Sequence, residues 1–335
     1  MKRFSRFAAT SLATVTLLAT PALAETWRLS SMMTPDSFEG QAYQRFADLV
    51  KDYSDGDLEI RIYPNEQIGS MDAVVEQLSA GIIQLAPSAV SFLSRWEEGI
   101  TYASAPFLFD SYEHWSAFIR GDLFQSWLTA AENEADIGVL GDIPAFPRGS
   151  FRTILSTQPL TSADDIADLR IRQYQNQLII NVWENLGAEV RVLPWGEVYD
   201  GISRGIVDAV TSPAELIKSM RFYEVAPNIA RTDEYPQAVT FMMNQSAFDA
   251  LPEKDRQALL KAHAEAAQYA RDLIFSQADT LVADLEAQEE VTFNMNFDVS
   301  TLVARTAALY ARMEQAGELP EGLLEAVEAA REATR

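Results

Sequence analysis

Residues 152–193 read RTILSTQPLTSADDIADLRIRQYQNQLIINVWENLGAEVRVL. This stretch alternates short apolar segments with segments of helical spacing, which predicts strands at 152–156, 170–173 and 190–193 and helices at 163–167 and 177–186. Strands separated by single helices are typical of α/β folds with largely parallel sheets, because each helix carries the chain back to the start of the next strand. The stretch therefore predicts one doubly wound α/β lobe.

An earlier part of the chain shows the same order of elements. We expect strands at 27–31, 58–63 and 82–86, with helices at 40–53 and 71–80 between them. A chain of 335 residues is long for one hydrophobic core, so two lobes are expected. We assign residues 25–149 and about 236–275 to the first lobe, and residues 150–235 and about 276–335 to the second.

A long helix is expected after Leu251. Pro252 is acceptable in a first turn, and apolar residues recur at helical spacing from Leu259 to Leu285. Extended towards Glu290, the helix would measure about 55 Å, which is longer than one small lobe. We therefore expect it to span both lobes.

The first 24 residues have the three parts of a secretory signal peptide. A basic start with Lys2, Arg3 and Arg6 precedes an apolar stretch (residues 7–20) and a cleavage site of small residues that ends at Ala24. The apolar stretch is short of the roughly 20 residues that a membrane anchor needs. We expect cleavage after Ala24 and export to the periplasm.

The composition excludes several classes of function. The chain has 26 basic against 49 acidic residues, a formal net charge of −23, which disfavours nucleic acids and anionic membranes as partners. It has no cysteine, so disulfides, thiol nucleophiles and thiolate metal sites are absent. If the chain binds an anion, the site must be a local positive exception to this acidity.

The sequence carries no recognisable catalytic motif. Its only histidines are His114, expected on a surface helix, and His263, expected in the long helix, and it lacks a nucleophile elbow, a Gly-rich phosphate loop and a His-Glu-x-x-His zinc motif. We expect neither enzymatic activity nor a cofactor, and no metal site is indicated.

Six segments, in order and at matching separations, resemble the periplasmic solute-binding proteins of TRAP (tripartite ATP-independent periplasmic) transporters, the DctP-like family. They are YPNEQIG (63–69), APFLF (105–109), SFR (150–152), DLRIR (168–172), PWGEVY (194–199) and GIVD (205–208). The resemblance implies a two-lobe periplasmic binding protein fold (type II-like), with a ligand cleft between the lobes and a long helix across both. It also implies a monomer without catalytic chemistry that delivers its solute to the small and large membrane subunits of a permease.

An arginine is the residue best suited to hold a carboxylate in such a cleft, because a guanidinium offers two parallel charge-assisted hydrogen bonds. Arg172 ends a predicted strand, where open α/β sheets bind ligands, but Arg170 lies on the same face by alternation, and spacing cannot choose between them. The resemblance selects Arg172 as the carboxylate partner and Arg152 as a second ligand-facing arginine. For Arg152, an arginine that closes the lobe junction is the alternative.

Further candidates follow from the resemblance. Ser212, in Thr211-Ser212-Pro213, stands where many relatives have a ligand-binding asparagine, and Trp195 stands at the cleft edge, with core packing at a helix start as its alternative. Loops expected to face the cleft add four residues, for which ordinary loop packing is the alternative: Tyr235, Phe38, Ser88 and Trp96.

The predicted function is capture of a small organic acid (a sugar acid, a C4-dicarboxylate or a 2-oxo acid) for a TRAP permease. A binding protein of the same architecture that serves an ATP-driven importer or a chemoreceptor is the alternative, because fold does not fix the partner.

Overall fold

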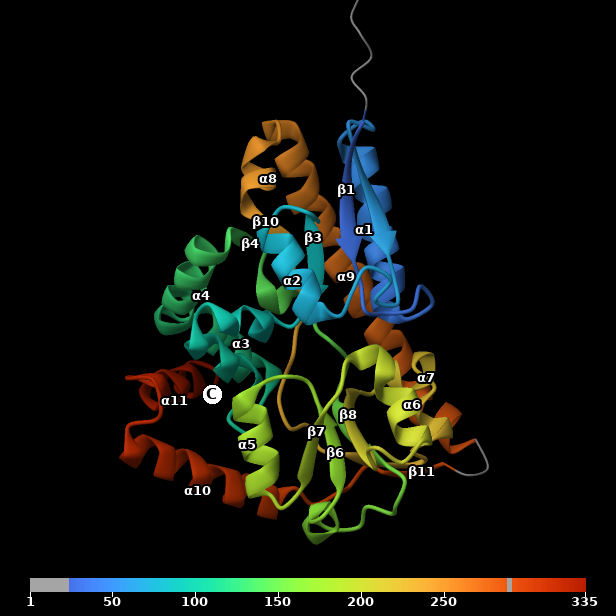
Figure 1. The fold of residues 1–335 in the computed structure, drawn as a ribbon, viewed down its shortest axis with the longest axis vertical. Coiled ribbons are helices and arrows are strands. Elements are labelled where there is room, and N and C mark those ends of the chain that lie inside the picture. Colours follow the sequence, from blue (N-terminus) through green and yellow to red (C-terminus); the bar gives the residue numbers. More distant parts are fainter. Residues whose placement is uncertain (1–23, 288–290) are drawn as a thin grey trace, which may run out of the picture.

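The structure is a computed structural model that describes residues 24–287 and 291–335. Its strands form two mixed sheets, each flanked by helices, which lie one above the other in Figure 1. The predicted signal peptide, up to residue 23, lies outside the described residues. Two α/β lobes were expected, and the two sheets confirm that part of the prediction.

The upper sheet in Figure 1 has the strand order β2-β1-β3-β10-β4. Its strands are β1 (Glu25–Ser30), β2 (Leu58–Tyr63), β3 (Leu85–Ser88), β4 (Ile137–Leu140) and β10 (Thr240–Asn244). β1 pairs in parallel with β2 and β3, whereas β10 returns from late in the chain and lies antiparallel between β3 and β4. The strand expected at 82–86 is β3 and begins later, because residues 81–84 form a turn that exposes Ile82.

The lower sheet has the order β11-β9-β5-β8-β6-β7. Its strands are β5 (Arg152–Ser156), β6 (Arg170–Gln173), β7 (Glu189–Val192), β8 (Ala209–Pro213), β9 (Asn228–Arg231) and β11 (Thr292–Asn294). β6 pairs in parallel with β7 and β8, and β5 is antiparallel to β8 and β9. The carboxyl ends of β6 and β8 therefore point in one direction, towards the upper sheet.

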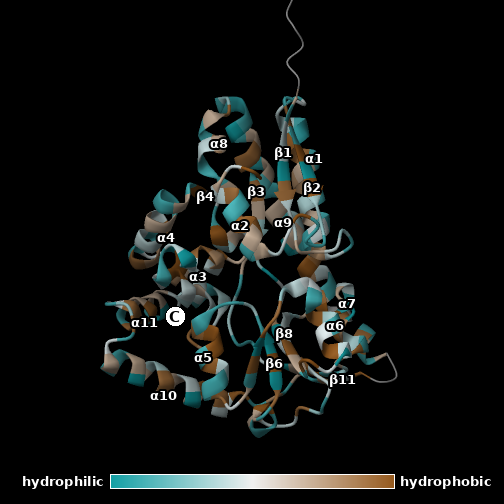
Figure 2. Ribbon diagram, in the orientation of Figure 1, coloured by the Kyte–Doolittle hydropathy of each residue, from teal (hydrophilic) through white to brown (hydrophobic). Residues whose placement is uncertain are grey.

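Helices surround both sheets. In the upper lobe these are α1 (Phe38–Tyr53), α2 (Met71–Ser79), α3 (Tyr112–Arg120), α4 (Asp122–Ala135) and α8 (Gln245–Ala250), with 3-10 helices η1 (Val90–Arg95), η2 (Glu98–Ser104) and η3 (Ile143–Ala145). In the lower lobe these are α5 (Gln177–Asn185), α6 (Val198–Ser203) and α7 (Leu216–Ser219), with η4 (Ala163–Ile166), η5 (Trp195–Glu197) and η6 (Phe222–Glu224). Figure 2 shows brown and teal residues mixed along the helices, as expected for amphipathic helices that bury one face. No helix in the described residues is long and apolar enough to cross a lipid bilayer.

The long helix α9 (Glu253–Glu286) connects the lobes. Small residues such as Ala262 and Ala266 on its buried stripe allow close approach to α1, where Phe46 and Val50 pack in the same core. Its later turns contact β11 of the lower sheet. The prediction of one helix spanning both lobes is confirmed.

Two extended segments also cross between the lobes, beside each other. Pro147 forms an isolated bridge with Ala238, the Val239 N–H donates to the Phe146 carbonyl at 2.8 Å, and the Arg148 N–H donates to the Gln237 carbonyl at 2.9 Å. Because paired backbone fixes side-chain directions, residues on these crossing segments hold defined positions between the lobes.

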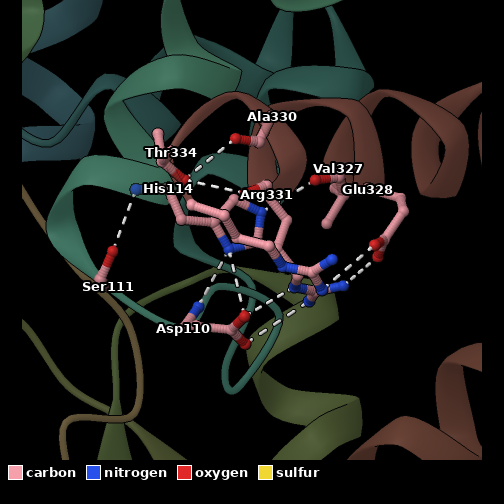
Figure 3. Close-up of polar contacts among 9 residues, drawn as sticks. Asp110, Ser111, His114, Val327, Glu328, Ala330, Arg331 and Thr334 are labelled. Carbon is pink, nitrogen blue, oxygen red and sulfur yellow. Dashed lines mark hydrogen bonds and ion pairs between the residues drawn. The ribbon is translucent and has the colours of Figure 1, made fainter.

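The C-terminal helices α10 (Ser300–Ala316) and α11 (Leu323–Ala333) attach to different parts of the molecule. α10 packs on α5, whereas α11 packs on α3. Figure 3 shows the second contact: His114 bonds the Val327 carbonyl at 2.9 Å, and Arg331 pairs with Asp110 at 2.6 Å. His114, expected at the surface, is therefore buried beneath α11. The lobe boundaries given above stay a prediction.

His263 is buried in α9 against the ring of Phe241 and the backbone of Gly141. A Cβ on Gly141, which has a φ of +76°, would lie 2.3 Å from His263 Nδ1, so only glycine fits there. Burial lowers the pKa of His263 to about 4. The ring is therefore neutral in the folded protein at neutral pH.

This burial predicts a pH-dependent loss of stability. The unfolded chain takes up a proton at His263 near the ordinary pKa of about 6.5, whereas the folded chain does so only near pH 4, so stability falls as the pH drops between these values. The full effect is on the order of 3 kcal/mol. Denaturant unfolding at pH 4 to 7 should show that the free energy of unfolding depends less steeply on pH for His263→Leu than for the wild type. Equal slopes would contradict the conclusion that His263 is buried in its neutral form.

Candidate ligand-binding site

A cavity lies between the two sheets, above the carboxyl ends of β6 and β8. The upper lobe supplies Met32, Met33, Ala89 and Phe92; the lower lobe supplies Arg172, Gln173, Tyr174, Trp195, Thr211, Pro213 and Leu216; and the crossing segments with the start of β5 supply Arg148, Arg152, Tyr235 and Gln237. The lining includes three arginines and no Asp or Glu. The cavity wall is therefore basic although the protein as a whole is acidic. A site for an anion in this protein requires such a local exception.

Arg148 is paired with a carboxylate outside the cavity. Its Nε and Nη2 donate to the two oxygens of Glu39 on α1, at 2.8 and 3.2 Å, and Tyr43 donates to the same carboxylate at 2.6 Å. Burial is the largest single influence and lowers the pKa of Arg148, but the charges of Glu39 and Tyr43 together with the hydrogen bonds to Glu39 leave the pKa raised. This bidentate pair neutralises Arg148 and fixes its crossing segment to the upper lobe.

Arg152, at the start of β5, is paired in the same way. Its Nε donates to Glu234 Oε1 at 2.7 Å, Nη1 to Gln237 at 3.2 Å and Nη2 to Thr211 at 3.4 Å. Burial is the largest single influence and lowers its pKa, but the charges of Glu234 and Tyr235 together with the hydrogen bond to Glu234 leave the pKa raised. Arg152 therefore takes part in a buried ion pair and also lines the cavity.

Arg172 differs from both. It is 6% exposed, and no carboxylate in the described residues lies within ion-pair distance of it. Within the part of the chain that the structure describes, its one side-chain hydrogen bond runs from Nε to the Leu193 carbonyl at 2.8 Å, which leaves both terminal nitrogens for a ligand. Burial lowers its pKa to about 10, so the guanidinium is charged at neutral pH and has no counter-ion among the described residues.

Two aromatic rings lie against these guanidinium groups. The Arg172 guanidinium carbon lies 5.3 Å from the centre of the Trp195 ring, and that of Arg152 lies 4.2 Å from the centre of the Tyr235 ring. Rings at these distances attract the cations and hold their planes in place. Trp195 also packs edge-on against Phe222, so it serves the core and the cavity together.

The lobes touch each other around the cavity. Ser91 and Tyr174 share a hydrogen bond at 3.0 Å, Thr101 donates to Asn176 at 3.0 Å, and the Gly196 N–H donates to Glu66 at 3.1 Å. Each contact joins the upper lobe to the lower one.

The structure brings together four of the eight residues predicted from the sequence: Arg152, Arg172, Trp195 and Tyr235. The other four lie elsewhere. Ser212 is fully buried with its hydroxyl on the Pro213 carbonyl, Phe38 packs in the upper core, Ser88 is buried in β3, and Trp96 lines a separate hollow outside this cavity. Arg170 points away and pairs with Asp208.

Strand alternation explains the position of Ser212. Thr211 and Pro213 line the cavity, so the residue between them faces the opposite side of β8. The same rule could have identified Thr211 from the sequence. Arg148 was missed because no local pattern connects it to Glu39, 109 residues earlier.

Comparison with known proteins identifies the family of this chain. The model of DctP, "Bacterial extracellular solute-binding protein, family 7", matches residues 29–315. The chain is 27% identical over 259 residues to the C4-dicarboxylate-binding periplasmic protein DctP of Rhodobacter capsulatus, covering 76% of each chain. It is 27% identical over 272 residues to the ectoine-binding periplasmic protein TeaA of Halomonas elongata, covering 80% of this chain and 77% of the other.

Among solved structures, a TRAP periplasmic solute-binding protein from Roseobacter denitrificans with bound L-galactonate is similar, with a TM-score of 0.81 and 23% identity over 91% of this chain and 98% of the other. This likeness establishes the two-lobe fold, and the family match covers most of the chain. The chain therefore belongs to the DctP family, family 7 of the bacterial extracellular solute-binding proteins, which are non-catalytic periplasmic proteins of TRAP transporters.

Proposed function

We propose that this TRAP solute-binding protein captures a small organic acid by pairing the ligand carboxylate with Arg172, and that it delivers the acid to the small and large subunits of a membrane permease. The observation that carries the proposal is a buried, charged arginine without a carboxylate partner in a cavity between two lobes. A carboxylate would replace the water that Arg172 has lost, through two parallel hydrogen bonds.

The other two arginines have a different part in the proposal. Arg148 and Arg152 already have Glu39 and Glu234 as partners, so they add N–H donors to the cavity wall but no net charge. Arg152 with Tyr235, and Trp195 beside Arg172, form the wall that orients the acid. Both ion pairs also hold the crossing segments, about which the lobes would open for release.

The proposal extends to export and delivery. Cleavage after Ala24 would leave β1 intact, because this strand begins at Glu25. The mature chain would then bind its acid in the periplasm as a monomer. Genes for a small and a large multi-span membrane protein beside this gene would support the permease as partner, and an ATPase gene in their place would contradict it.

Replacing Arg172 with Met should remove binding without harming the fold. Losing the partner of a ligand carboxylate costs at least about 2 kcal/mol, which is roughly 30-fold in affinity. The unliganded variant should unfold no more easily than the wild type, and at neutral pH it should gain up to roughly 3 kcal/mol, since a pKa of about 10 reflects the cost of burying the charge. Calorimetric titration and thermal unfolding measure the two effects.

The matched control is Arg170→Met, on the same strand. Arg170 is partly exposed and pairs with Asp208 away from the cavity, so this variant should keep the wild-type affinity. Loss of affinity in Arg170→Met, or its retention in Arg172→Met, would mean that Arg172 does not hold the acid.

A further inference from the structure

We infer that the cavity takes an acid with a single carboxylate and an apolar body, in preference to a dicarboxylate or a polyhydroxylated sugar acid. The inference rests on the proposed pairing with Arg172 and adds the chemical class of the ligand. It departs from the solutes named for the relatives above, which include a C4-dicarboxylate and galactonate. Three features of the cavity lead to it: its charge count, the state of its polar groups and the character of its wall.

The charge count leaves room for one anion. Arg148 is balanced by Glu39 and Arg152 by Glu234, so Arg172 supplies the one uncompensated positive charge among the lining residues. A second ligand carboxylate would therefore be buried without an uncompensated cation of its own among the lining residues, which is strongly unfavourable.

The polar groups of the cavity are mostly bonded to one another. Thr211 and the Gln237 side-chain oxygen accept from Arg152, and the Tyr174 hydroxyl shares a hydrogen bond with Ser91. Two lining groups differ: the amide nitrogen of Gln173, which is 2% exposed, and the buried Nε1 of Trp195 have no partner among the described residues. These free groups are donors beside or next to Arg172, so each hydroxyl of a sugar acid that is buried away from them without a partner would weaken binding.

The remaining wall is apolar. Met32, Met33, Phe92 and Leu216 contribute to the lining, together with Trp195. Methionine and aromatic side chains adapt to an alkyl chain or a ring, and burying such a group from water favours binding. Arg172 with Gln173 thus provides a polar end for the carboxylate and its neighbouring oxygen, and the rest of the cavity suits hydrocarbon.

A six-carbon series tests the inference on the wild-type protein. Hexanoate, adipate and gluconate have the same number of carbons, but hexanoate has an apolar tail, adipate a second carboxylate and gluconate five hydroxyls. 4-Methyl-2-oxopentanoate adds a branched body and phenylacetate an aromatic one. Hexanamide is the uncharged control. Calorimetric titration should show that at least one apolar monocarboxylate binds ten times more tightly than both adipate and gluconate, and that hexanamide does not bind.

The outcomes separate this inference from the proposed function. If adipate or gluconate binds as tightly as the best apolar acid, the inference is wrong and carboxylate capture stands. If no acid binds while hexanamide does, or if none of the six compounds binds, carboxylate capture at Arg172 fails and the inference fails with it.

Glu234→Gln tests the charge count directly. It would free the charge of Arg152, so the affinity ratio of adipate to hexanoate should rise at least tenfold over the wild type. Glu132→Gln, a half-buried carboxylate on α4 outside the cavity, is the control and should leave the ratio unchanged. An unchanged ratio in folded Glu234→Gln would overturn the charge count, and Glu39→Gln repeats the test at Arg148 if that variant does not fold.

Discussion

The arrangement of the cavity depends on one charge that the protein leaves without a partner. Arg172 is buried as deeply as Arg148 and Arg152, yet these two have carboxylates at 2.7 to 2.8 Å and Arg172 has a single backbone carbonyl. A buried cation without a counter-ion is costly, and proteins retain such a group where a ligand completes it. The buried charge of Arg172 lowers the stability of the unliganded fold. An anion that pairs with Arg172 would remove this cost, which would favour binding.

The fold keeps this charge in place by making the surrounding parts rigid. β6 places Arg172 at the carboxyl edge of the lower sheet, and the neighbouring turn supplies the Leu193 carbonyl that orients it. The crossing segments are fixed by Glu39 and Glu234, one from each side of the cavity. The lobes also touch at Glu66 and Gly196, so the proposed capture of an acid between them would depend on how the lobes lie.

Much of this could be predicted from the sequence, where local pattern or family motif carried the signal. Alternating strands and helices predicted two lobes, the apolar spacing after Pro252 predicted α9, and the strand-end rule with the DLRIR motif led to Arg172. Contacts between distant residues could not be predicted: the pairing of Arg148 with Glu39, the burial of His114 under α11 and the insertion of β10 into the first sheet depend on tertiary packing. Strand register also decides which side of β8 Ser212 faces, because a shift of one residue turns every side chain to the opposite side of the sheet.

The position of a bound acid tests the central claim most directly. A crystal structure of the protein with its bound acid should show the ligand carboxylate about 3 Å from both terminal nitrogens of Arg172. In the same structure Glu39 should still pair with Arg148, and Glu234 with Arg152. A carboxylate held by Arg148 or Arg152 instead, or an Arg172 side chain turned out of the cavity onto a protein carboxylate, would contradict the account.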